Sequence, residues 1–218
     1  MNYVWSHALD YNQNATTTDT SNNQYDPYGG QGADYGNSNY NVPDRVAGYV
    51  LYNFPNTSRG DWMKYLANDW AIDTGFQAQS GLPYSASLSS YPSYNALNSS
   101  WNGAGGTSWI PVIGRNTYKY PRDIVQDVRL QKQISFTERY KGEARLDLYN
   151  VYNHQNVTGV QTTAYVLGGT SSGNPNVSTA TFQNGIAGTA NFGTANNSNS
   201  SGFLYTPREV AIAFKFLF

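Results

Sequence analysis

Residues 210–218 alternate between large apolar side chains and mostly small or charged ones. Val210, Ile212, Phe214, Phe216 and Phe218 occupy every second position, with Ala211, Ala213, Lys215 and Leu217 between them. Successive side chains of a β-strand point to opposite faces, so this period of two predicts a strand with one apolar face. Chain ends usually fray in soluble domains, which makes a strand that ends on a terminal aromatic residue unusual there.

Residues 122–137 and 139–153 repeat this alternation over greater lengths. Their apolar positions are Ile124, Val128, Leu130, Ile134, Phe136, Ala144, Leu146 and Leu148. The positions between them mix acidic and basic side chains, as expected for the hydrated inside of a barrel. The side chains predicted to face such a lumen are Asp123, Asp127, Arg129, Glu143, Arg145, Asp147 and Lys215. A tight turn is predicted near Thr137 and Glu138, where the two strands meet.

Three further segments are predicted as strands, which brings the count to about six. The predicted strands cover residues 2–8, 44–54, 69–86, 122–137, 139–153 and 203–218. The longer ones reach the ~9–11 residues that cross a bilayer, against ~5–6 in ordinary globular strands. Their connections alternate between short turns and long polar stretches, the pattern of short periplasmic turns and long extracellular loops. We therefore predict an all-β chain whose six antiparallel meander strands form part of a transmembrane outer-membrane β-barrel.

Composition agrees with this architecture and disfavours several others. Charged residues make up 12% of the chain, against about 25% in soluble domains. A net charge of −1 gives no electrostatic case for nucleic-acid binding, and the absence of cysteine excludes disulfides and thiolate metal sites. No apolar run approaches the ~18 residues of a transmembrane helix. Residues 1–7 do not resemble a secretory signal, so we expect either a cytoplasmic chain or a mature or truncated portion of a longer protein.

The titratable residues give no convincing active site. The two histidines, His7 and His154, lie far apart in the sequence, and we expect both at the outer rim rather than in a metal site. The mixed charges on the two long strands could form a catalytic set, but an ion-pair ladder between neighbouring strands explains them more simply. Gly-rich stretches lack the following helix that a phosphate site requires. We predict neither enzymatic activity nor a bound cofactor or metal.

Tyrosines suggest two kinds of aromatic surface. One group lies in a long polar segment and either contacts a carbohydrate or peptide ligand or packs on neighbouring loops; both alternatives stay open. This group consists of Tyr25, Tyr28, Tyr35 and Tyr40. The second group is expected to form girdles at headgroup depth, where aromatic rings favour the membrane interface. Its members are Tyr49, Tyr52, Trp70 and Phe136.

Four segments resemble the barrel end of TonB-dependent receptors. They are residues 3–10 (YVWSHALD), 80–84 (SGLPY), 115–122 (RNTYKYPR) and 148–156 (LYNVYNHQN). In this order and spacing they are similar to the Oar-like group of acidobacterial type, which carries a carboxypeptidase-regulatory-like domain. The resemblance implies that this chain is the C-terminal portion of an outer-membrane receptor that binds a ligand and imports it across the membrane.

The resemblance also implies partners. These are outer-membrane lipid, the remainder of the barrel and its plug, and an inner-membrane energy-transducing complex reached through an N-terminal part that this chain lacks. Val210, Ile212, Phe214, Phe216 and Phe218 resemble the signal that the barrel assembly machinery reads. Bacterial single-chain barrels start at eight strands, so six strands are expected to form an open sheet with two edges. The alternative is a surface β-rich protein that self-assembles through those edges.

Overall fold

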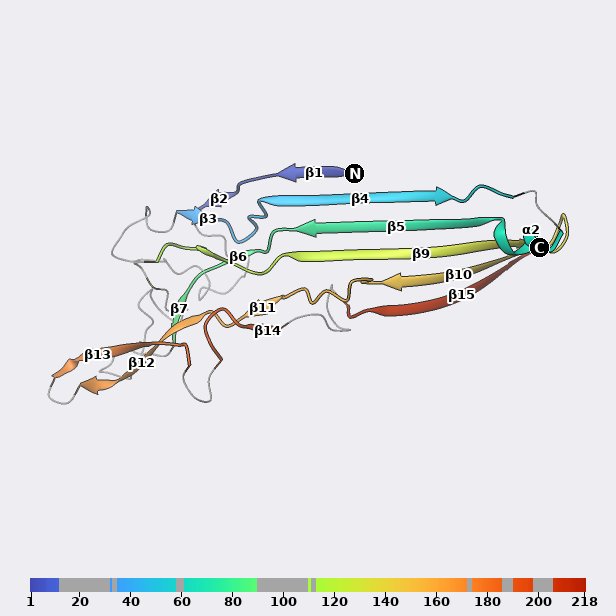
Figure 1. The fold of residues 1–218 in the computed structure, drawn as a ribbon. Helices are drawn as coiled ribbons and strands as arrows, with labels where there is room; N and C mark the ends of the chain where they lie inside the picture. Colours follow the sequence, from blue (N-terminus) through green and yellow to red (C-terminus); the bar gives the residue numbers. More distant parts are fainter. Residues whose placement is uncertain are drawn as a thin grey trace.

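The computed structural model describes residues 1–11, 32, 35–57, 61–89, 110, 113–171, 174–185, 190–197 and 206–218. One six-stranded antiparallel sheet dominates it (Figure 1). Its strands are β1 (Asn2–Trp5), β4 (Asp44–Asn53), β5 (Trp70–Gln79), β9 (Asp123–Ser135), β10 (Lys141–Tyr149) and β15 (Glu209–Leu217). Each pairs with the next of the six along the chain, so the sheet is a meander. The predicted fold of about six long antiparallel strands is confirmed.

The sheet is open. In the described part of the chain β1 pairs only with β4 and β15 only with β10, so each of these outer strands has one edge without a strand partner. Strand β1 is also short: Asn2 pairs with Ala47, and residues 48–53 of β4 have no partner on that side. Figure 1 shows β1 beside one half of β4 only. Four of the other five strands have 9 or 10 residues and β9 has 13, the length that crosses a bilayer.

Strand register separates the sheet into an apolar and a polar face. Directly paired residues of an antiparallel sheet lie on the same face. One row therefore runs from Tyr52 through Ile72, Leu130 and Leu146 to Ile212. The adjacent row, on the other face, runs through Leu51, Asp73, Arg129, Asp147 and Ala211. The alternation read in the sequence thus maps onto two opposite surfaces.

Polar residues on the apolar face have partners inside the sheet. Gln126 donates from Nε2 to Thr74 Oγ1 (3.1 Å), and that hydroxyl donates to the Asp127 carbonyl (2.9 Å). Lys132 donates from Nζ to the Asn68 carbonyl (2.7 Å) and lies 5.1 Å from the centroid of the Trp70 ring. A polar group in an apolar environment is costly unless it is hydrogen-bonded. These exceptions therefore do not interrupt the apolar surface.

The girdle prediction is wrong for Tyr49. Its strand partner is Gly75, and Gly75 lies on the same face as Asp73, so Tyr49 belongs to the polar face. Tyr52 and Trp70 lie on the apolar face near the strand ends that are joined by short turns. At the same end Phe136 has its ring centroid 6.0 Å from that of Phe216. Parity explains the error, because positions 49 and 52 differ by three and must point to opposite faces.

The two ends of the sheet differ in their connections. Residues 136–140 form the predicted tight turn, in which the Thr137 hydroxyl accepts hydrogen bonds from the amides of Arg139 (3.3 Å) and Tyr140 (3.0 Å). The connection from β4 to β5 holds a short helix, α2 (Asp61–Ala67), at the same end. No helix in the described ranges has the length and apolar character needed to cross a membrane.

At the opposite end the long connections are not structureless, contrary to expectation. They contain the two-to-three-residue strands β2 (Leu9–Asp10), β3 (Gly36–Asn37), β6 (Pro83–Tyr84), β7 (Ser87–Ser89), β8 (Tyr118–Lys119), β11 (Gly159–Val160) and β14 (Ala195–Asn197), and a hairpin of two nine-residue strands, β12 (Thr163–Ser171) and β13 (Asn174–Phe182). A small buried cluster of Ala86, Ile110 and Ala164 lies among them. Backbone pairing between loops satisfies polar groups that long irregular segments would leave unpaired. The loops therefore form a second layer beyond the sheet.

Two predicted strands end earlier than expected because turn geometry takes the chain out of the sheet. The strand predicted over 69–86 ends at Gln79, since Gly81, two residues later, packs closely against the backbone carbonyl groups of Tyr120 and Pro121. The strand predicted over 139–153 ends at Tyr149, since Asn150 has a φ of 47°, a left-handed conformation that a strand does not contain.

We predict that Gly81→Ala destabilises the protein by at least about 1–3 kcal/mol, the usual cost of overpacking. An added Cβ would lie 2.1 Å from the Tyr120 oxygen and 2.5 Å from the Pro121 oxygen, and backbone cannot move aside cheaply. Gly75→Ala is the control, because its nearest neighbour would be Tyr49 Cδ2 at 4.0 Å. Urea unfolding in lipid, followed by gel mobility, measures both variants. Equal midpoints for the two variants would contradict this role of Gly81.

Candidate functional site

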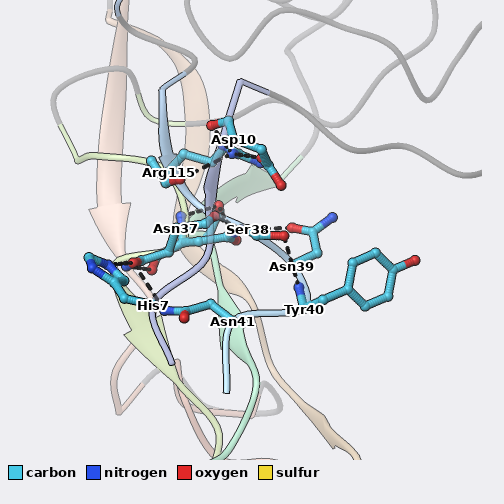
Figure 2. Close-up of polar contacts among 11 residues, drawn as sticks. His7, Asp10, Asn37, Ser38, Asn39, Tyr40, Asn41 and Arg115 are labelled. Carbon is cyan, nitrogen blue, oxygen red and sulfur yellow. Dashed lines mark hydrogen bonds and ion pairs between the residues drawn. The ribbon is translucent and has the colours of Figure 1, made fainter. Parts of the chain in front are cut away.

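The bases of the first two long loops are joined by a buried ion pair. Arg115 and Asp10 form a salt bridge in which their side chains are 5% and 14% exposed. Arg115 Nη2 also donates to the Asp10 carbonyl (2.6 Å) and to the Gly36 carbonyl (3.4 Å). Figure 2 shows the guanidinium reaching β2 and β3 from the neighbouring loop. Loops that are far apart in sequence are thereby held together by one cation.

Asparagine side chains continue this junction toward the sheet. Asn116, with a φ of 52°, donates from Nδ2 to the Asn37 carbonyl (2.7 Å) and to Asn39 Oδ1 (2.7 Å). Its backbone amide donates to the Ser85 hydroxyl (2.8 Å). Asn41 accepts from the Ala8 amide (2.9 Å) and is 1% exposed. We call Asp10, Asn37, Asn41, Arg115 and Asn116 the loop junction.

The third long loop is fastened by the segment that follows β10. Asn156 accepts from the Ile124 amide (2.7 Å) and donates to the Ile124 carbonyl (3.1 Å), so its amide takes the place of a strand neighbour. Asn150 donates from Nδ2 to the carbonyls of His154 (3.1 Å) and Thr206 (2.9 Å). These amides hold both ends of the third loop against the sheet.

Above the junction, aromatic rings from the second and third loops pack together. Tyr84 stacks on Tyr118 with ring centroids 5.6 Å apart, and Tyr118 meets Phe192 edge-on at 4.9 Å. Burial raises the pKa of Tyr84 above its ordinary value, and the neighbouring phenols of Tyr118 and Tyr120 raise it further. Burial alone raises the pKa of Tyr120. Tyr84 and Tyr120 therefore lie in a partly dry environment that favours their neutral phenols.

Comparison with known proteins gives one match. Residues 1–108 match the family model for an outer membrane beta barrel domain. Together with the open meander of bilayer-length strands, this match decides the class. The protein is an outer-membrane β-barrel protein. It is located in the bacterial outer membrane. Barrels of this class have short periplasmic turns and long extracellular loops, which assigns the long loops and their junction to the extracellular side. A search of curated proteins finds no match. A search of solved structures finds none either.

The residues predicted to face the lumen share the polar face of this barrel sheet. Arg129 donates from Nε to Asp147 Oδ1 (2.6 Å) and from Nη2 to Oδ2 (3.2 Å). Arg145 forms an ion pair with Glu143, and Glu143 lies opposite Lys215 in the register. The other two, Asp127 and Asp123, accept from the Asn150 amide (2.9 Å) and Gln79 Nε2 (3.1 Å). The structure thus joins these side chains in pairs along one surface rather than in one focused cluster.

The structure describes two of the four tyrosines of the possible ligand-contact loop. Tyr25 and Tyr28 lie outside the described residues. Tyr35 is 50% exposed and packs on Tyr11 with ring centroids 5.0 Å apart. Tyr40 is 64% exposed and points away from the junction in Figure 2. Tyr35 thus packs within its own loop, whereas Tyr40 presents its ring on the extracellular surface.

Both histidines contact the bases of loops. His7 Nε2 lies 3.2 Å from Asn37 Oδ1, and His154 Nε2 lies 3.2 Å from the Arg122 carbonyl. No group of three or more His, Cys, Asp or Glu side chains is placed to hold a metal ion in the ranges that the structure describes. Each histidine follows the end of its strand, at Trp5 and Tyr149, on the extracellular side.

The predicted assembly signal forms the apolar side of an outer strand. Its side chains are between 52% and 88% exposed: Val210, Ile212, Phe214, Phe216 and Phe218. In the described chain β15 pairs with one strand, β10, so its other edge is open. Such an edge can accept a further strand through its unpaired backbone groups. The recognition of this strand by assembly machinery remains a prediction.

Sequence reasoning missed the loop junction. Asp10, Arg115 and Asn116 enter the sequence analysis only as parts of resembling segments, and Asn37 and Asn41 do not enter it at all. Asparagine is unusually suited to a left-handed φ, and Asn116, Asn150 and Asn153 all adopt one. The repeated asparagines of residues 148–156 were therefore a readable signal for turns, although they do not reveal which loop each turn contacts.

We predict that Arg115→Met destabilises the loop junction by about 3–5 kcal/mol, because it leaves Asp10 as an uncompensated buried charge. The double variant Asp10→Asn with Arg115→Met should recover a large part of this loss. Amide hydrogen exchange of residues 36–41 in the folded protein measures the stability of the junction in each variant. Arg45→Met is the matched control, since Arg45 is exposed and, among the residues that the structure describes, its side chain donates to Gln77 (3.0 Å) on the sheet. Equal protection in the two single variants would show that the ion pair does not hold the loops.

We predict that Tyr84 ionises above the ordinary tyrosine pKa of 10.0. A raised pKa means that the folded state favours the neutral phenol. Its contribution to stability is complete below the unfolded pKa and is lost as the pH rises through the folded one. The 295 nm absorbance of the native protein minus that of Tyr84→Phe isolates this titration. A midpoint at or below pH 10.0 would mean that the ring is hydrated rather than packed.

Proposed function

We propose that this protein is the C-terminal barrel portion of a TonB-dependent receptor, which binds a ligand outside the cell and imports it. The main support is the open sheet. Six strands are too few for a membrane barrel, which needs at least eight, and the outer edges of β1 and β15 have no strand partner in the described chain. Backbone groups in the bilayer core must be paired. The sheet therefore needs further strands, and larger barrels have room for a plug.

The extracellular layer supports a receptor rather than a plain pore. Asp10, Arg115 and Asn116 join two long loops, and Asn150 and Asn156 fasten the third. A binding surface must be held in place, because ordering loops on binding costs free energy. The segments that resemble the receptor family contribute these contacts: Asp10, Arg115, Asn116, Asn150 and Asn156 all lie within them. The polar face with its ion pairs then lines the hydrated interior.

Self-assembly through the sheet edges is the second candidate, and strand direction favours it. Strand β1 runs from the turn end to the loop end, and β15 runs the opposite way. The outer edge of β15 in one copy could therefore pair antiparallel with β1 of another. Several copies would then close a barrel that one copy cannot.

The mass of the protein in the outer membrane distinguishes the two candidates. An epitope inserted within residues 90–109 allows immunoblotting of the native gene product. We expect a single band far above 24.1 kDa, and we expect the purified protein to be captured by the periplasmic domain of the energy transducer. A band at 24.1 kDa that cross-links into a ladder of multiples would overturn the receptor proposal and support self-assembly. A large protein that the transducer does not capture would agree with a larger barrel but would exclude energy-driven import.

A further inference from the structure

Helix α2 presents an exposed apolar face at the periplasmic end of the sheet. Trp62, Tyr65 and Leu66 are 67%, 71% and 62% exposed. They are separated by three and four positions, so they lie together on one side of the helix. Lys64 lies on the opposite side, because each residue turns the helix by about 100°. Three large exposed side chains on a seven-residue helix are an unusual surface to leave in water.

The helix is attached to the lipid-facing side of the barrel. Trp70 and Lys132 pair directly on the apolar face of β5 and β9. Trp70 Nε1 donates to the Leu66 carbonyl (2.6 Å), and Lys132 Nζ donates to the carbonyl of Asn68 (2.7 Å), just after the helix. Between the helix and the end of β9, Tyr65 and Ile134, which lies on the apolar face, line a hollow together with polar residues, namely Lys64, Asn68, Asp69, Gln133 and Ser135. The exposed helix face thus continues the surface that the barrel presents to lipid.

Hydrogen bonds within the turn hold the helix in this position. Asn68 accepts from the Thr57 amide (2.7 Å) and donates to the Thr57 carbonyl (3.1 Å). Asn56 accepts from the Asp69 amide (2.9 Å) and donates to the Asp69 carboxylate (3.2 Å). The two ends of the turn are therefore clamped together. A swing of the helix from the lipid side to the lumen would break the bond from Trp70 to the Leu66 carbonyl.

We propose that α2 is an interfacial anchor that lies in the periplasmic phospholipid leaflet, with Trp62, Tyr65 and Leu66 inserted at the boundary of headgroups and acyl chains. Tryptophan and tyrosine favour this depth because one part of the ring system is apolar and the other can hydrogen-bond. The helix is about 10 Å long at ~1.5 Å per residue, so it fits within the interfacial zone when it lies flat. Tyr52, Trp70 and Phe136 lie at the same end of the sheet, and Tyr52 packs edge-on against Phe54 with ring centroids 5.2 Å apart, so this end is rich in aromatic rings.

The absence of cysteine from the sequence makes a direct test practical. Single spin labels are placed at Tyr65→Cys and Lys64→Cys in the full-length protein, reconstituted into bilayers of phosphatidylethanolamine and phosphatidylglycerol. Val50→Cys, on the apolar face of β4, calibrates lipid exposure, and Thr117→Cys, in an extracellular loop, calibrates water exposure. Power saturation then compares accessibility to oxygen, which dissolves in lipid, with accessibility to a nickel chelate in water.

The proposal requires opposite results from the two sides of the helix. The label at Tyr65 should respond to oxygen several-fold more than to nickel, approaching the label at Val50, while the label at Lys64 should respond mainly to nickel. Two nickel-accessible labels would place the helix in water, and two shielded labels would mean that protein covers it; either result overturns the anchor. In Trp62→Ser with Leu66→Ser, the label at Tyr65 should shift toward nickel, whereas the label at Val50 should not change. An unchanged label at Tyr65 would also refute the anchor.

Discussion

Backbone hydrogen bonding is the constraint on which this structure depends. Hydrocarbon offers no partner for an amide or a carbonyl, so each strand that crosses a membrane must find its partners in neighbouring strands. The meander meets this need for β5, β9 and β10 along most of their lengths, whereas β4 has a partner on its β1 side only at residues 44–47. It does not meet it at the outer edges of β1 and β15, which are short of partners in the described chain. Those two edges are therefore the places where the sheet must pair with further strands.

The same constraint reverses the usual distribution of polar and apolar residues. The apolar face of the sheet carries some of the most exposed side chains of the protein, such as Ile212 at 83%. The most buried large side chains are polar, Asn41 and Asn156, and both lie where loops meet the sheet. Lipid acts as the solvent of the outer surface, so no large apolar core is needed. In the described part of the extracellular layer, hydrogen-bonded amides, the ion pair of Arg115 with Asp10 and a small cluster of apolar and aromatic side chains hold the loops together.

Lipid solvation also accounts for the polar exceptions on the apolar face. Gln126 and Thr74 hydrogen-bond each other, and Lys132 turns toward a carbonyl and the Trp70 ring at the periplasmic end. A long lysine can leave hydrocarbon in this way when its stem is near the interface. The same end carries helix α2, so aromatic, cationic and helical elements meet at one level. This grouping is typical of the boundary between acyl chains and headgroups.

The sequence alone determined the strands and their faces, because side-chain alternation has a fixed period and lipid demands an apolar row at every second position. The strand at residues 210–218 and the shared face of the charged residues from Asp123 to Asp147 could therefore be assigned from the sequence alone. Only the tertiary structure showed helix α2 and brought Arg115 to Asp10, 105 positions away. Contacts between loops depend on where distant segments meet, and no local periodicity records that. The strands follow from pattern, whereas the extracellular junction follows from packing in three dimensions.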